Sequence, residues 1–122
     1  MSELAKAVPN AGVREWSQRQ FRMAVSSVTI SEIIYGFEAK PNPTISAHFE
    51  GVVLQVLEIL PVTESIARRA GILRGRLQRS GRVRSLADML IAATAAEHGL
   101  TIVTRNARDF EGCGLHILNP FR

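Results

Sequence analysis

The hydrophobic positions of this chain recur either as short β-rich runs or at spacings of three and four residues. Short runs rich in valine, isoleucine and threonine predict strands, and the longer spacing predicts helices. Strands are expected at residues 23–28, 58–62, 100–104 and 115–118. Helices are expected at residues 2–20 with a break near Pro9 and Gly12, at 29–37, from 44 onward, at 63–80 and at 85–98.

Helix-capping residues mark several of these boundaries. Thr29 stands before the second helix, Thr63 before the fourth and Ser85 before the fifth, and a side-chain oxygen at that place accepts a free backbone N–H. Gly99 stands where a C-terminal glycine ends a helix. Alternation of strands and helices predicts an α/β fold with a mainly parallel sheet, whose ligands bind beyond the carboxyl ends of the strands.

The chain's size and composition narrow the class of protein. With 122 residues, 46% of them hydrophobic, the chain suits one folded domain spanning residues 1–122. A single cysteine, Cys113, excludes an internal disulfide and favours the cytoplasm. No apolar run is long enough to span a membrane, and neither a GxGxxG nor a Walker lysine loop occurs.

The charge favours an acidic partner. The net charge is +4, and seven arginines with no acidic residue among them lie between positions 68 and 84: Arg68, Arg69, Arg74, Arg76, Arg79, Arg82 and Arg84. Guanidinium groups bind two phosphate oxygens at once, so this stretch is a candidate contact for an RNA or DNA backbone. An acidic protein partner and a plain solvated face stay open as alternatives.

Two carboxylates are candidates for chemistry. Glu32 stands three residues after Thr29, and Asp88 stands three after Ser85, so both fit capping boxes that need no metal. Both helices are nevertheless expected to begin at the same edge of the sheet, with Thr104, Arg105 and Asn106 ending a strand there. Carboxylates beside a phosphate-attracting surface would suit Mg²⁺ or Mn²⁺, which bridge to substrate phosphate.

Several segments resemble the PIN-domain ribonucleases of the VapC and FitB type. The resemblance is carried by "VSSVTISEIIYG", by "SLADMLIAATAAEHGLTIVTRNARDF" and by "SELAKAVPNAGVREW", and it covers nearly the whole chain. It implies a three-layer PIN-like α/β fold, an endoribonuclease dependent on Mg²⁺ or Mn²⁺, a homodimer and a VapB-like antitoxin partner. By position, Glu32 and Asp88 match metal-site residues of the family, and Thr104 would hold a water or phosphate.

The chain departs from the family pattern in two places. Asn106 stands where many members carry an aspartate, and Asp109 is a candidate to supply that carboxylate, unless "DF" is a turn anchored by Phe110. A first strand with its aspartate, expected before Ser2, is absent, so either the natural product starts upstream or another segment fills the gap. Arg82, Arg84 and Arg105 complete the predicted RNA contacts.

Three functions are compatible with these residues. The first is a metal-dependent endoribonuclease toxin that cleaves RNA phosphodiester bonds. The second is a catalytically impaired PIN domain that binds RNA or antitoxin without cleaving. The third is an unrelated α/β module in which Glu32 and Asp88 are only helix caps.

Overall fold

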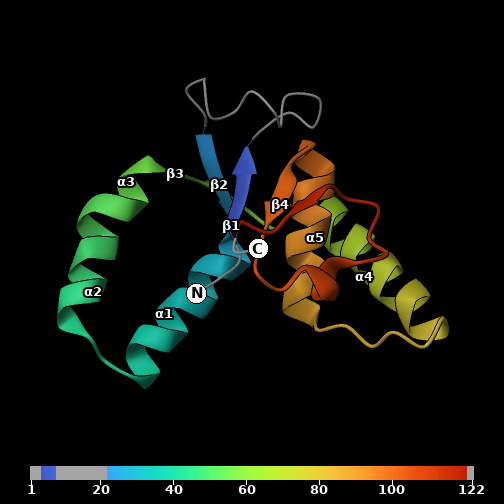
Figure 1. The fold of residues 1–122 in the computed structure, drawn as a ribbon, viewed down its shortest axis with the longest axis horizontal. Helices are drawn as coiled ribbons and strands as arrows, with labels where there is room; N and C mark the ends of the chain where they lie inside the picture. The colour runs from blue at the N-terminus through green and yellow to red at the C-terminus, as the bar shows by residue number, and fades with distance from the viewer. Residues whose placement is uncertain (1–3, 8–21, 121–122) are drawn as a thin grey trace.

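A computed structural model describes residues 4–7 and 22–120, and its centre is a five-stranded sheet (Figure 1). The strands are β1 (Leu4–Ala7), β2 (Arg22–Ser26), β3 (Leu57–Leu60), β4 (Thr101–Val103) and β5 (Ile117–Leu118), in the spatial order β3-β2-β1-β4-β5. The β2–β3 and β4–β5 pairs are parallel, as expected. Both pairs that include β1 are antiparallel, so β1 alone among the described strands runs against the other four, and the mainly parallel sheet is confirmed.

The central strand β1 corrects the prediction of a helix at residues 2–20. Ala5 pairs with Ala24 of β2 and with Ile102 of β4, so this short segment has a sheet neighbour on each side. Pairing on two sides outweighs a local helical preference, which is worth less than about 1 kcal/mol per residue. The predicted helix at 8–20 lies outside the described residues, and the upstream family strand stays a prediction.

The four predicted strands are confirmed in place, with shorter bounds. The described helices are α1 (Ser27–Ala39), α2 (Pro43–His48), α3 (Leu54–Val56), α4 (Glu64–Arg79) and α5 (Leu86–His98). A π-helical segment, Phe49–Val53, joins α2 to α3, and a short 3₁₀ helix, Ala107–Phe110, follows β4. No helix among the described residues is long and apolar enough to cross a membrane.

The core lies where α5 covers the sheet. Met89, Ala92, Ala93 and Ala95 on α5 are fully buried. Small alanine side chains let α5 come close to the strands on one side and to α4 on the other, and Figure 1 shows α5 between β4 and α4. Burial on several sides also explains why α5 is apolar around most of its circumference.

Helices α1, α2 and α3 form an arm on the opposite side of the molecule (Figure 1). Asn42 begins α2 by accepting the N–H of Ile45 at 3.2 Å, and Pro43 occupies the first turn, where its missing N–H is not needed. Phe49 is buried and packs edge-on against Phe37 of α1, with ring centroids 5.7 Å apart. This aromatic pair fixes the π-helical segment against α1.

Candidate nuclease site

The strand directions bring the predicted site residues toward one edge of the sheet. Because β1 runs antiparallel to both β2 and β4, those two strands and their parallel partners all end at the same edge. Helix α1 begins there, directly after β2. Helix α5 must also begin near this edge, because only Gly99 and Leu100 separate its end from the start of β4, against which it packs. The expected convergence of the two helix N-termini is therefore confirmed.

Glu32 does not occupy the capping position expected for it. The N-cap of α1 is Ser26, whose Oγ accepts the N–H of Val28 at 3.1 Å, and Thr29 is a buried residue inside the first turn. The strand ends earlier than predicted because Ser26 is both its last residue and a good cap. Glu32 therefore lies in the second turn of α1, where its side chain is exposed. It borders a hollow between α1 and α2 that Phe37 and Lys40 also line.

Asp88 lies in the first turn of α5, as predicted. Its N–H donates to Ser85 Oγ at 3.0 Å, which confirms Ser85 as the N-cap. The half-buried Asp88 is close enough to Cys113 to influence that thiol. Burial raises the pKa of the Cys113 thiol, the positive charges of Arg84 and Arg82 lower that pKa, and the charge of Asp88 raises it. Asp88, Arg82 and Arg84 therefore all lie near the Cys113 thiol.

Thr104 shapes the loop that follows β4. Its side chain is fully buried, its backbone N–H donates to the Leu118 carbonyl at 3.0 Å, and its Oγ1 accepts the N–H of Asn106 at 3.0 Å. This hydroxyl thus holds Asn106 at the strand end, and its contact with a water or phosphate stays a prediction. Arg105 is exposed, and its carbonyl accepts from Asn119 Nδ2 at 3.4 Å.

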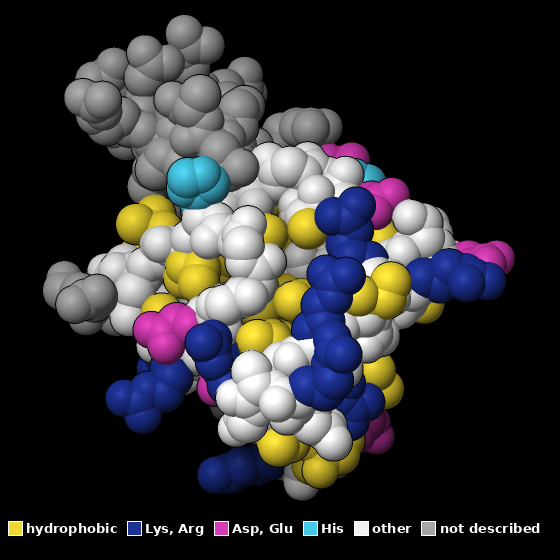
Figure 2. Space-filling model, turned by 90° about the vertical axis from the view of Figure 1, so that its right-hand side faces the viewer, with side chains coloured by type: hydrophobic (Ala, Val, Ile, Leu, Met, Phe, Trp, Pro, Cys, Tyr) yellow, Lys and Arg dark blue, Asp and Glu magenta, His cyan; other side chains and the backbone are white. Residues whose placement is uncertain are grey.

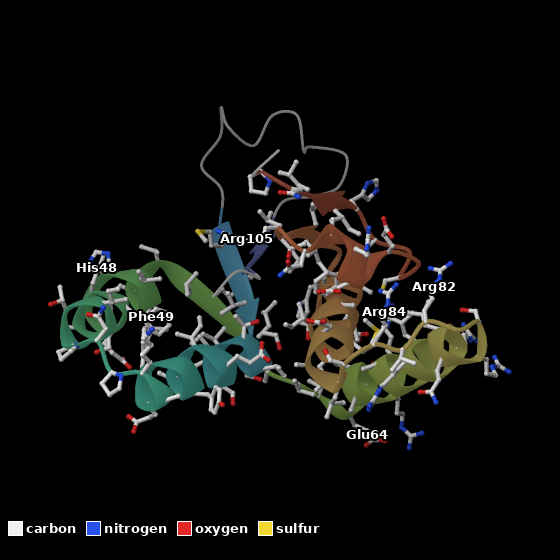
Figure 3. The ribbon with its side chains drawn as sticks, turned by 60° about the horizontal axis from the view of Figure 1, so that its bottom comes forward. His48, Phe49, Glu64, Arg82, Arg84 and Arg105 are labelled. Atoms are coloured by element: carbon white, nitrogen blue, oxygen red, sulfur yellow. The ribbon has the colours of Figure 1, made fainter. Side chains whose placement is uncertain are left out.

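Asp109 lies on the short 3₁₀ helix beside the arginines that follow α4. Arg84 Nη1 donates to the Asp109 carbonyl, and Arg82 Nη1 donates to the Glu111 carbonyl at 3.4 Å. Figure 3 shows Arg82 and Arg84 as neighbours near the far end of α4, with Glu64 at its beginning. The Asp109 side chain is exposed, whereas the next residue, Phe110, is fully buried. Anchoring by Phe110 is thereby confirmed, and a metal-binding role of Asp109 stays a prediction.

The site residues form two groups rather than one. Asp88, Arg82, Arg84 and Asp109 surround the start of α5, while Glu32 stands on α1, which packs against α5. Within residues 4–7 and 22–120, no three or more His, Cys, Asp and Glu side chains are grouped to hold a metal ion.

The roles of two residues in this region were not predicted from the sequence. Ser26 could have been found as a cap from the Ser-Ser pair that precedes the apolar run. Arg108 lines a hollow of about 570 Å³ together with Arg82, Arg84 and Asp109, and only the folded structure brings it there.

Comparison with known proteins assigns this fold and site to a class. The family described as PIN domain matches residues 5–112, so the chain belongs to the PIN-domain family. The PIN-like α/β fold is confirmed by the crystal structure of DNA-bound VapBC from Salmonella typhimurium. That structure has a TM-score of 0.71 and 32% identity, and the match covers 88% of this chain and 79% of that chain.

Curated relatives place the chain among the VapC proteins of that family. It is 35% identical to VapC ribonuclease Y4jK of Sinorhizobium fredii, over 99% of this chain and 92% of that protein. It is 40% identical to the tRNA(fMet)-specific endonuclease VapC of Shigella flexneri, over 85% of this chain and 80% of that protein. Membership of this family removes the third hypothesis, an unrelated α/β module.

Proposed function

We propose that this chain is the endoribonuclease toxin of a type II toxin–antitoxin pair and that it hydrolyses RNA phosphodiester bonds. The observation that carries the proposal is the meeting of the α1 and α5 N-termini at one sheet edge, with Asp88, Arg82 and Arg84 all near the Cys113 thiol, in a VapC-type PIN domain. Helix N-termini and guanidinium groups both attract phosphate. The names of the relatives support RNA as the substrate.

The donor set suits Mg²⁺ or Mn²⁺. These ions take oxygen ligands and are commonly held by one or two carboxylates, with water and substrate phosphate completing the coordination. Asp88 and Glu32 would hold the ion from neighbouring helices, and Asp109 is the third candidate. The bound ion would supply a water of lowered pKa and would offset charge on the scissile phosphate.

The remaining side chains position the substrate. Arg82 and Arg84 are already ordered by hydrogen bonds to the carbonyls of Glu111 and Asp109, and a neutral carbonyl leaves their positive charge available to phosphate. Thr104 holds the backbone of Asn106, whose amide can donate to a phosphate oxygen or accept from a ribose hydroxyl. Arg105 is exposed at the same loop and extends the cationic surface.

A cleavage assay tests the catalytic proposal. Purified protein is incubated with total tRNA in Mg²⁺, in Mn²⁺ and in EDTA, and the products are followed on denaturing gels. We expect chelation to stop cleavage, and Asp88→Asn or Glu32→Gln to slow it by about 100-fold or more, since even groups that only orient metal ligands are worth 10- to 100-fold. Glu50→Gln, at an exposed glutamate of the π-helical segment outside the site, is the matched control and should leave the rate unchanged.

Two results would count against this function. Cleavage that survives EDTA and both substitutions would remove the metal mechanism. Absence of cleavage together with retained RNA binding would identify the catalytically impaired PIN domain instead. The uncharged Asn106 and the lack of a three-member acidic group among the described residues favour that second candidate.

A VapB-like antitoxin is the proposed partner, and the toxin acts in the cytoplasm as a homodimer. The relative solved as a VapBC complex supports the pairing. Coexpression with a VapB-like antitoxin should yield a stable complex with suppressed cleavage, and size-exclusion chromatography with light scattering would detect the complex. Free toxin that elutes as a monomer would overturn the dimer.

A further inference from the structure

A row of arginines runs along one side of α4, and none of these arginines was assigned to the candidate site. Ile66, Ala70 and Leu77 of α4 are buried, and Arg68, Arg69, Arg76 and Arg79 are exposed. At about 100° per residue, these four arginines share one side of the helix, and we call them the α4 arginine row. Figure 2 shows basic side chains forming a nearly continuous row down this face of the molecule.

The row borders a hollow between α4 and α5. The hollow measures about 410 Å³, and its lining includes Arg68, Arg69 and Arg76 beside the apolar side chains of Leu73, Ala93 and Ala96. The alanines of α5 are short, so an extended chain can approach the helix backbone between the guanidinium groups. A groove with a cationic wall on the α4 side and an apolar floor suits a sugar–phosphate backbone, which has anionic oxygens and apolar ribose carbons.

The positive charge of the row increases toward the candidate site. Arg68 pairs with Glu64 at 2.8 Å, and Arg69 pairs with Glu97 at 3.3 Å, both at the N-terminal end of α4. In the described part of the chain, the Arg76 and Arg79 side chains have no hydrogen-bond or ion-pair partner. Beyond α4 come Arg82 and Arg84, whose partners are neutral carbonyls. The uncompensated charge therefore leads along the helix to the start of α5.

We propose that the α4 arginine row binds the phosphodiester backbone of RNA beyond the scissile bond, as a contact surface separate from the cleavage residues. This inference rests on the proposed ribonuclease function. Arg69 to Arg79 spans about 15 Å of helix, which provides room for several phosphates. The α4 arginine row of a second protein copy is excluded as the binding partner of this row, because the contact would place positive charges opposite each other. Binding outside the site raises affinity for long RNA without changing the chemical step.

The test compares two arginines on the same helix. Arg76 belongs to the row, whereas Arg74 is also exposed but lies about 200° around the helix from it. Each is changed to glutamine in an Asp88→Asn background, so that the RNA is not cut during the measurement. Binding of fluorescein-labelled U20 RNA is followed by fluorescence anisotropy between 50 and 300 mM KCl, and a triple variant of Arg69, Arg76 and Arg79 to glutamine extends the series.

We expect Arg76→Gln to lower the slope of log Kd against log salt by about 0.7, the value for one phosphate of a single strand, and the triple variant to lower it by about 2. The triple variant should weaken binding by about tenfold or more at 150 mM salt, and Arg74→Gln should change Kd by less than about twofold. In the otherwise wild-type protein, the triple variant should raise KM for total tRNA and leave kcat unchanged.

Equal effects of Arg74→Gln and Arg76→Gln would overturn the inference, because net charge alone would then explain binding. Unchanged RNA binding by the triple variant would overturn the inference too. If that variant instead lost binding to the antitoxin, the α4 arginine row would be assigned to an acidic protein partner. Circular dichroism melting checks that the triple variant is folded. The anisotropy measurement requires no cleavage, so it tests the α4 arginine row alone. Failure of the nuclease proposal would be seen in the separate assay, as absence of RNA cleavage by the wild-type protein.

Discussion

Ser85 is the residue that starts α5 and thereby sets the position of Asp88. Its hydroxyl accepts the Asp88 N–H at 3.0 Å, so Ser85→Ala leaves a backbone donor without this partner. We expect the free energy of unfolding to fall by about 1 kcal/mol, measured by urea denaturation. Ser85→Thr, which keeps the hydroxyl, is the matched control and should lose much less. Equal losses in the two variants would show that the hydroxyl is not the cause.

Cys113 reports on the charges around the candidate site. Burial raises the pKa of its thiol, even though Arg84 and Arg82 lower that pKa, so the thiolate fraction at pH 8 is smaller than in the unfolded chain. Iodoacetamide should therefore alkylate the folded protein more slowly than the urea-unfolded protein, and the folded rate should keep rising to higher pH. Arg84→Gln removes a charge that lowers the pKa, so it should slow alkylation further, as mass spectrometry can measure. A faster reaction in this variant would contradict the assigned charge effect.

The 3₁₀ helix Ala107–Phe110 combines a structural anchor with an exposed carboxylate. Phe110 is fully buried, and Phe110→Ala should reduce the free energy of unfolding by about 3–5 kcal/mol, measured by denaturation. Asp109→Asn, at the neighbouring exposed position, should leave stability within about 0.5 kcal/mol.

Asp109→Asn also separates the two roles weighed for the "DF" pair. If Asp109 supplies the third carboxylate of the metal site, this variant loses tRNA cleavage while remaining folded. If the Asp109→Asn variant cleaves tRNA at the full rate, Asp109 is not a metal ligand and the segment serves only to anchor Phe110 in the core.

The start of α1 shows why the boundaries of helices and strands could not be predicted from the sequence. Ser26, Ser27 and Thr29 are all acceptable caps, so local chemistry does not choose among them. The choice follows from β2, which pairs with β3 as far as Ser26↔Leu60 and then leaves the sheet. Glu32 consequently lies in the second turn of α1 and not at the capping position that the sequence predicted. Ser85 had no competing cap nearby, and its prediction was correct.

At the scale of the molecule, β1 joins the two halves of the sheet. It is the sole link between β2 and β4 in the strand order of the described residues, and its pairing is entirely through the backbone. Ala5→Pro removes a backbone N–H from this central strand and should cost about 3 kcal/mol or more. Ala5→Ser keeps the N–H and is the control. Thermal melting by circular dichroism should show a large loss for proline alone, and a proline variant as stable as the serine variant would argue against a central β1.

The sequence by itself determined the α/β class, four of the five strands, the apolar side of α4, the Ser85 cap with Asp88 behind it, and the resemblance that family comparison confirmed. These features depend on local periodicity and on side chains that act on their own turn of helix. Only the tertiary structure decided that residues 4–7 form a central strand, that α1 starts after Ser26, and that Arg108 joins Arg82 and Arg84. Each of those outcomes depends on partners far away in the chain, whose pairing and burial outweigh the local preferences that a sequence displays.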